Sequence, residues 1–253
     1  MIFDLQKASF AKRISSFLFD VIILCVVSVG LATLLSFVVG YDARLSELET
    51  KYKEYEEKYG IDTNISEDDY NALSDAEKEI YAEASGAMAE DEELNKAYSV
   101  LLNLSLITVS FAILLAYVGT EVVVPCFLKN GQTIGKKIFG IALMRTDGVA
   151  VSFFQVFVRA IIGKYTVETM IPVFLLLFMF FGIIGSLGFM IIVGLLILQL
   201  IVMISSRTNS LIHDLFAVTV VVDLSTQMIF KTPDEMLEYK KALAEKKARE
   251  QSY

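Results

Sequence analysis

Three long runs of uncharged residues define the pattern of hydrophobic and polar positions along this chain. They cover residues 21–41, 97–120 and 170–206, with lengths of 21, 24 and 37 residues. The first two lengths suit single membrane-spanning helices, which need about 20 apolar residues. The third run would give a helix about 55 Å long against a hydrocarbon core of about 30 Å, so it predicts more than one span.

Glycines interrupt the third run near its middle. Gly182, Gly185 and Gly188 mark the place where a turn between two helices would fall. The run therefore predicts a helical hairpin, with one span over 165–181 and another over 187–206. Together with the first two runs, this gives four transmembrane helices.

Lysine and arginine collect in three places that indicate how the spans are oriented. They lie near the N-terminus, in the connection between the second and third spans, and in the tail after the fourth. Because cytoplasmic loops carry an excess of basic residues, we expect this connection and both termini to be cytoplasmic. Two termini on one side require an even number of spans, which agrees with the hairpin.

The pattern predicts an all-α integral membrane protein of the plasma membrane, with the lipid bilayer as its first partner. It divides the chain into six segments. These are the N-terminus with the first span (1–41), an acidic extracytoplasmic insert (42–96), the second span (97–124), a cytoplasmic connection (125–164), the transmembrane hairpin (165–206) and a cytoplasmic tail (207–253).

The insert is polar and predicts two to four helices outside the membrane. Its 18 acidic and 6 basic residues give it a net charge of −12. Tyr52, Tyr55 and Tyr59 follow a helical spacing and are expected mainly to pack a small helical hairpin, although they could also bind a partner or glycan. Ser66 and Ser74 each begin a helix-capping pattern, the second with a capping box.

The cytoplasmic connection predicts small elements at the inner membrane surface. Two apolar runs, 138–144 and 149–151, flank the Asp147-Gly148 turn signal and predict a β-hairpin. The β-branched run 217–222 could add a strand. Residues 153–164 predict an amphipathic helix that lies at the interface.

Composition narrows the class of protein further. The chain of 253 residues is 55% hydrophobic, which is more than a soluble domain of this size could bury. Its net charge of −8 argues against nucleic-acid binding, which needs a basic face. Cys25 and Cys126 match no metal or disulfide spacing and are expected to be small buried hydrophobic residues. We therefore expect no cofactor and no metal.

Two carboxylates are expected at a similar depth in the membrane. Asp20 lies within the first span, and Glu121 lies near the inner end of the second. Arg13 lies about 10.5 Å before Asp20 along a helix, so a direct ion pair would be stretched and Ser16 is better placed for a hydrogen bond. The candidate counter-charges are Arg13, Arg159 and Lys164.

These carboxylates have two interpretations. Ionisable residues inside a membrane often belong to transport sites, so Asp20 and Glu121 could form a proton-coupled site. Equally, their ion pairs could only fix the register of the helices. His213 beside Asp214 could shuttle protons or could be a hydrogen-bonded structural residue. No pattern typical of a hydrolase or metalloprotease is present, so we expect no enzymatic activity.

Motifs in both halves of the chain resemble one known pattern. Arg13 heads the first span with Asp20 inside it, and His213, Asp214 and Leu215 follow the fourth. Between them lie a glycine–lysine stretch and an arginine, with the members Gly131, Thr133, Gly135, Lys136, Gly140 and Arg159. Together these motifs resemble the RDD family of membrane proteins, which is named for one arginine and two aspartates, here Arg13, Asp20 and Asp214.

The resemblance covers about residues 7–40 and 98–223 and leaves out the acidic insert and the end of the tail. It implies a mostly bacterial membrane protein of the kind usually described as a transporter, and some members are thought to exchange sodium for protons. A monovalent cation and a proton are then the implied substrates. Four helices make a small pathway, so a homo-oligomer or a partner membrane protein is expected. The alternative is an accessory or scaffold protein that binds partners through its insert and tail.

Overall fold

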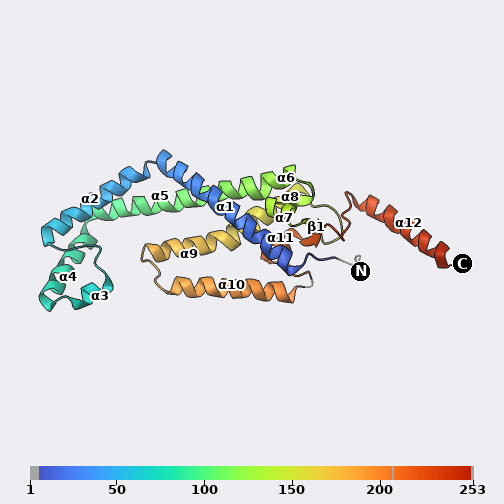
Figure 1. The fold of residues 1–253 in the computed structure, drawn as a ribbon. Helices are drawn as coiled ribbons and strands as arrows, with labels where there is room; N and C mark the ends of the chain where they lie inside the picture. The colour runs from blue at the N-terminus through green and yellow to red at the C-terminus, as the bar shows by residue number, and fades with distance from the viewer. Residues whose placement is uncertain (1–5, 207, 252–253) are drawn as a thin grey trace. The chain divides into compact units, whose positions relative to one another are not determined.

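The computed structural model describes residues 6–206 and 208–251 (Figure 1). Residues 1–5 of the predicted N-terminal segment, and 207 and 252–253 of the predicted tail, lie outside the described residues. The chain forms two compact units. The first unit consists of Met1–Leu31 and Ser110–Tyr253, and the second unit consists of Ala32–Val109.

The four predicted spans are confirmed as helices that are long and apolar enough to cross a membrane. Within the described residues these helices cover Phe10–Val38, Glu92–Phe127, Phe153–Phe180 and Leu187–Ser205. Large apolar side chains on them point outward, as lipid contact requires. Cys25 and Cys126 are also exposed, so the prediction that they are buried is wrong.

Each span has its own internal structure. The first is the single helix α1 (Phe10–Val38). The second joins α5 (Glu92–Tyr117), the π-helix η1 (Val118–Val123) and α6 (Val124–Phe127). The third joins α8 (Phe153–Phe157), the π-helix η3 (Val158–Met170) and α9 (Ile171–Phe180), and the fourth is α10 (Leu187–Ser205).

The predicted hairpin joins α9 and α10, which lie next to each other in Figure 1. The chain between them turns at Gly182 and Gly185, whose φ angles of 72° and 51° lie in the left-handed region. Glycine adopts this conformation without steric cost, which explains why the uncharged run folds back at this point.

The third span begins at Phe153 rather than at residue 165. Ser152 caps it, because its side chain accepts a hydrogen bond from the backbone of Gln155 and forms a capping box. The amphipathic helix predicted at 153–164 is therefore the first part of the span and not a separate interfacial element. The polar residues in this part, Arg159 and Lys164, are buried among other charged groups.

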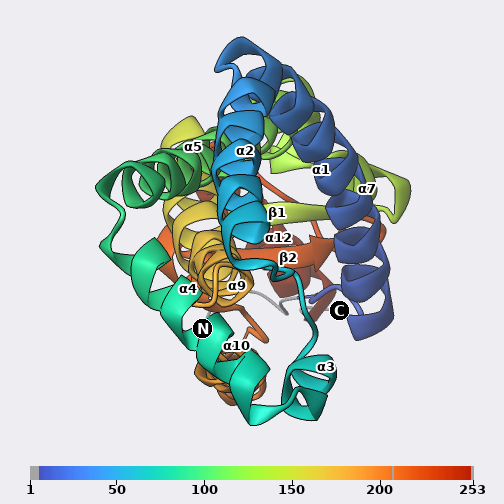
Figure 2. The ribbon, with the colours of Figure 1, turned by 90° about the vertical axis from the view of Figure 1, so that its left-hand side faces the viewer.

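The sheet also differs from the predicted hairpin. Strand β1 (Ile141–Arg145) pairs antiparallel with β2 (Thr219–Asp223), and the two lie side by side in Figure 2. Residues 149–151 form isolated bridges instead of a strand, an antiparallel one between Met144 and Ala150 and a parallel one between Val149 and Phe230. The distant strand β2 completes a fully buried apolar face, which the short run 149–151 could not do.

The second unit contains the predicted polar helices. They are α2 (Tyr41–Tyr59), α3 (Glu67–Ala72) and α4 (Asp75–Glu90), with the first part of α5. Ser66 and Ser74 cap α3 and α4 as predicted, the second with a capping box. Tyr52 and Tyr55 pack against a core around Leu48, which favours the packing interpretation of the tyrosines.

The short elements of the first unit connect its spans and its sheet. They are the 3-10 helix η2 (Lys129–Gly131), α7 (Ile134–Ile138), α11 (Ile212–Ala217) and the polar tail helix α12 (Pro233–Gln251).

The predicted orientation can be tested with single cysteines at exposed positions on either side of the first span. In a chain whose Cys25 and Cys126 are changed to Ser, we expect Asn64→Cys to react with a membrane-impermeant maleimide on intact cells. Thr226→Cys should react only after the cells are permeabilised, because the positive-inside rule places it in the cytoplasm. The opposite labelling pattern would contradict the predicted orientation.

Candidate functional site

Nine buried or half-buried charged and titratable side chains come together inside the first unit. We call them the charge cluster. Its members come from α1, η1, α7, η3 and α11 and are Arg13, Asp20, Glu121, Lys136, Arg159, Lys164, Glu168, His213 and Asp214.

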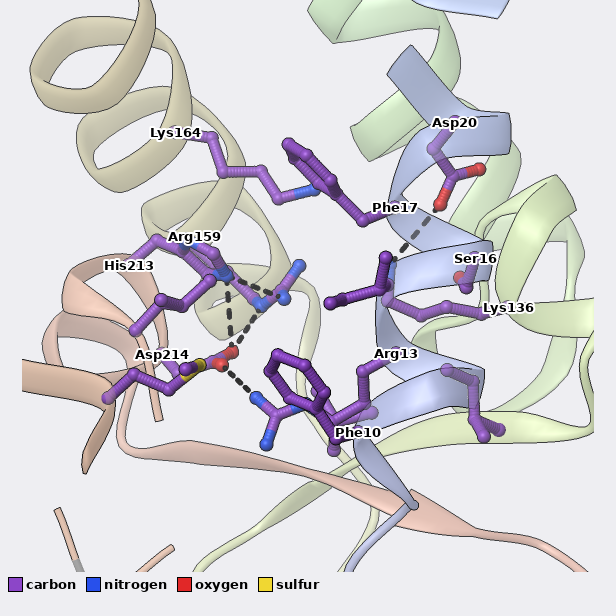
Figure 3. A pocket seen from close by; sticks show the side chains of 15 residues that line it. Phe10, Arg13, Ser16, Phe17, Asp20, Lys136, Arg159, Lys164, His213 and Asp214 are labelled. Atoms are coloured by element: carbon purple, nitrogen blue, oxygen red, sulfur yellow. Dashed lines mark hydrogen bonds and ion pairs between the residues drawn. The ribbon is translucent and has the colours of Figure 1, made fainter. Parts of the chain in front are cut away.

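Arg159 lies at the centre of the charge cluster (Figure 3). Its Nε donates to Asp214 Oδ1 at 2.8 Å, and its Nη2 lies 2.9 Å from His213 Nε2. Its Nη1 lies 3.9 Å from Glu121 Oε2. One guanidinium thus joins the second span, the third span and the segment after the fourth.

Glu121 is paired a second time on the third span. Lys164 Nζ donates to its Oε1 at 2.5 Å, and both side chains are buried. Of the predicted counter-charges, Arg159 and Lys164 therefore lie beside Glu121, and Arg13 does not. A buried carboxylate held by two cations avoids the large cost of an unpaired charge.

The π-helix η3 explains how Arg159 and Lys164 reach the same cluster. Two residues that lie five apart in an α-helix point about 140° away from each other. The i→i+5 hydrogen bonding of a π-helix widens each turn and brings such residues towards one face. η3 is 13 residues long, where a single turn is usual. Glu168 follows Lys164 on the same π-helix and joins the cluster through His213.

Asp20 has different partners from those predicted. It accepts hydrogen bonds from Thr133 Oγ1 at 2.5 Å and from the Gly135 backbone at 2.8 Å, and Lys136 Nζ lies 3.7 Å away. Neither Ser16 nor Arg13 provides these bonds. Thr133, Gly135 and Lys136 of the glycine–lysine stretch therefore hold Asp20, because α7 packs directly against α1.

Glycine makes this approach possible. A Cβ atom on Gly135 would lie 2.5 Å from the Ser16 carbonyl oxygen and 2.8 Å from Asp20 Oδ1. Gly131 is different, because its φ angle of 59° serves the turn of η2, and a Cβ there would meet Val151 rather than the cluster.

Asp214 is the most completely buried carboxylate of the cluster, at 1% exposed. Its Oδ2 lies 3.6 Å from Arg13 Nη2 and accepts no hydrogen bond from the described residues. Burial alone would raise the pKa of Asp214, but the adjacent Arg159 holds it well below its usual range. The carboxylate is therefore charged, and one of its oxygens has an unused acceptor site.

His213 is buried as a neutral imidazole. Arg159 can only donate, so Nε2 of His213 must accept, and Nδ1 carries the proton that faces Glu168 Oε2 at 2.7 Å. Burial lowers the pKa of His213, and the charge of Asp214 opposes this shift. The geometry therefore favours the structural interpretation of His213 in the resting state. Glu168 was missed by sequence reasoning, and its only signal was a carboxylate beside an uncharged run.

A cavity of about 140 Å³ lies between α1, η3 and α11 and reaches the charge cluster (Figure 3). Of the described residues, six charged ones line it, namely Arg13, Asp20, Lys136, Arg159, Lys164 and Asp214, together with His213. Apolar side chains of α1 complete its wall. Among the described residues, no group of His, Cys, Asp and Glu side chains is arranged to hold a metal ion.

The profile of the RDD family matches residues 7–218. The chain belongs to the RDD family. All nine members of the charge cluster lie within the matched region of this RDD protein. No curated protein and no solved structure gives a significant match.

The contact between η3 and α11 predicts a strong effect of a single methyl group. A Cβ on Gly163 would lie 2.5 Å from His213 Cβ and 2.6 Å from His213 Cα. We expect Gly163→Ala to lower stability by about 1–3 kcal/mol, as overpacking does. Thermal unfolding in detergent measures this. Gly194→Ala is the matched control, since its Cβ would meet nothing within 4 Å, and an equal loss in the control would contradict the prediction.

The buried neutral His213 predicts an acid-sensitive fold. Its folded pKa is lower than its unfolded value of about 6.5, so its contribution to stability is present above that pH and is lost as the pH falls. We expect the unfolding temperature to drop between pH 7.5 and 5.5, and His213→Gln to reduce this drop. The charged groups that face the His213 ring are Glu168, Arg159 and Asp214. If His213→Gln left the pH profile of unfolding unchanged, the acid sensitivity would belong to these groups and not to His213.

Proposed function

We propose that this RDD family protein is a membrane transporter of a small ion or solute, and that the cavity is its binding site. The observation that carries the proposal is that the cavity is lined by Asp214, whose buried Oδ2 has no hydrogen-bond donor among the described residues. A buried acceptor left unused costs free energy, which a bound ligand or water would recover.

The ion pairs around the cavity support a role in transport. Arg13 and Asp214 lie 3.6 Å apart, beyond the usual hydrogen-bond range, and they belong to different elements. A contact of this length can be exchanged for a contact with a solute at small cost. By contrast, Arg159 and Lys164 are held by close carboxylates and would serve as the fixed part of the site.

Exchange of sodium for protons is the sharpest form of this proposal. In that mechanism Asp20 and Asp214 would bind a cation and a proton in alternation, since both line the cavity. We further propose that the protein is bacterial, lies in the plasma membrane, has no enzymatic activity and works as a homo-oligomer or beside a partner membrane protein, because four helices form only a small pathway.

The second candidate is a non-transporting accessory or scaffold protein. The observation that favours it is that Asp20, Glu121 and Asp214 each already face a lysine or arginine within 4.0 Å, while Glu168 faces the neutral ring of His213. Ion pairs of this kind would only fasten the helices, and the polar helix α12 and the acidic second unit would bind partners.

Reconstituted vesicles can separate the two candidates. We expect the pure protein to give a sodium-dependent proton flux, reported by a trapped pH-sensitive dye. Asp20→Asn and Asp214→Asn should each abolish most of this flux, because an amide cannot exchange a cation for a proton. The matched control is Asp147→Asn, since Asp147 is half exposed, pairs with Arg145 and lies outside the cavity lining.

Two results would count against transport by this mechanism. One is a flux that both cavity variants leave unchanged while all three variant proteins are folded. The other is no flux from the pure protein, together with recovery of one stoichiometric partner on purification from membranes, which would favour the scaffold.

A further inference from the structure

The cavity presents more hydrogen-bond donors than acceptors. Its lining includes four basic side chains, Arg13, Lys136, Arg159 and Lys164, and two carboxylates, those of Asp20 and Asp214. The other two carboxylates of the cluster, Glu121 and Glu168, are not among the lining residues. The charge that faces the cavity is therefore positive, although the cluster as a whole is balanced.

Two of these basic groups have donors to spare. The Arg13 guanidinium has five N–H groups, and no described residue accepts a hydrogen bond from them, since Asp214 Oδ2 lies 3.6 Å away. Lys136 Nζ gives one hydrogen bond to Thr133 Oγ1 at 3.0 Å and lies 3.7 Å from Asp20. Its side chain is 6% exposed, so water does not replace the missing partners as it would at a surface.

The wall of the cavity is apolar on the side of α1. Phe10, Ile14 and Phe17 line the cavity at a spacing of four and three residues, which places them along one face of the helix. They are 59%, 40% and 53% exposed, so this face continues from the cavity to the outer surface of the spans. A ligand that fits both parts has an anionic end and an apolar body.

We propose that the cavity binds the phosphate group of an anionic membrane lipid, with Arg13 and Lys136 as its donors. The acyl chains then lie over Phe10, Ile14 and Phe17, in the membrane leaflet on the side of the sheet. This inference rests on the general form of the proposed function, a small solute bound in this cavity. It is an alternative to the sodium–proton form, because the net positive lining favours an anion. The shared chemistry is a phosphate oxyanion, which a lipid or a soluble phosphate ester could supply.

The ionisation of Lys136 gives this binding a characteristic pH dependence. Burial lowers the pKa of Lys136 to about 8, although Glu121 opposes the shift. Lys164 and Arg159 lie near enough to add to the lowering, and Asp20 opposes it. A bound phosphate would favour the charged ammonium, so affinity should fall as the pH rises above about 8.

Native mass spectrometry of the full chain in detergent tests the proposal. Phosphatidylglycerol, phosphatidylcholine and glycerol phosphate are titrated separately against the wild type and the variants. We expect the wild type to prefer phosphatidylglycerol to phosphatidylcholine. Arg13→Gln and Lys136→Met should each weaken its binding about ten-fold or more, since each removes hydrogen bonds to a charged group. Lys137→Gln is the matched control, because Lys137 is the exposed neighbour of Lys136 and lies outside the lining.

The arms of the experiment separate the possible results. Binding of glycerol phosphate as tight as that of the lipid would keep the phosphate site and identify a soluble ester as its ligand. Equal binding of the two lipids by the wild type would overturn the proposal, as would variants that lose nothing. If a variant does not fold, lipid binding by the wild type is compared at pH 7 and pH 9. Binding that is unchanged at pH 9 would count against Lys136 as a donor.

This outcome is independent of the flux measurement. Selective lipid binding without any flux would retain the site and reject transport. Flux without selective binding would reject the lipid and retain transport.

Discussion

A guanidinium cannot give up its proton inside a protein, so a buried arginine has to be neutralised where it lies. Arg159 is 4% exposed, and the first unit is built around its compensation. Its nitrogens face Asp214 and His213 of α11 and Glu121 of η1, which lie far from it along the chain. The packing of α11 on η3 and of η1 on η3 follows from this requirement, and so does the close contact of Gly163 with His213.

Asp20 meets the same requirement with neutral groups. A hydroxyl and a backbone amide provide its hydrogen bonds, and the nearest ammonium lies 3.7 Å away. The carboxylate is thus stabilised without taking up all the donors of Lys136. Because Asp20 is held mainly by neutral groups, some basic groups of the cluster still face the cavity. In a cluster that served only to fasten helices, every basic group would be paired with a carboxylate.

The sequence predicts the local elements of the fold better than the contacts between distant segments. The four spans, the turn near Gly182 and the caps at Ser66 and Ser74 are encoded by neighbouring residues, so local patterns suffice for them. Membership of the charge cluster is visible for every member except Glu168, because a charge within or beside an apolar run requires compensation. The pairing inside the cluster is not visible, because it depends on which helices pack together. The run 217–222 predicts the strand β2, but not its pairing with β1, because the two strands lie far apart along the chain and only one bridge of the local hairpin forms.

The π-helix η3 is the feature that a period of 3.6 residues cannot reveal. Its hydrogen bonds connect each residue to the fifth along the chain, and the α-helical alternative connects each to the fourth. The structure holds this segment in the first of these two hydrogen-bond registers. In the second register Lys164 would turn away from the side on which Arg159 lies, and the bond to Glu121 would break. In the third span, the hydrogen-bond register of η3 therefore determines which ion pairs its side chains form. A change in the register requires a change in the ion pairs, and the reverse also holds.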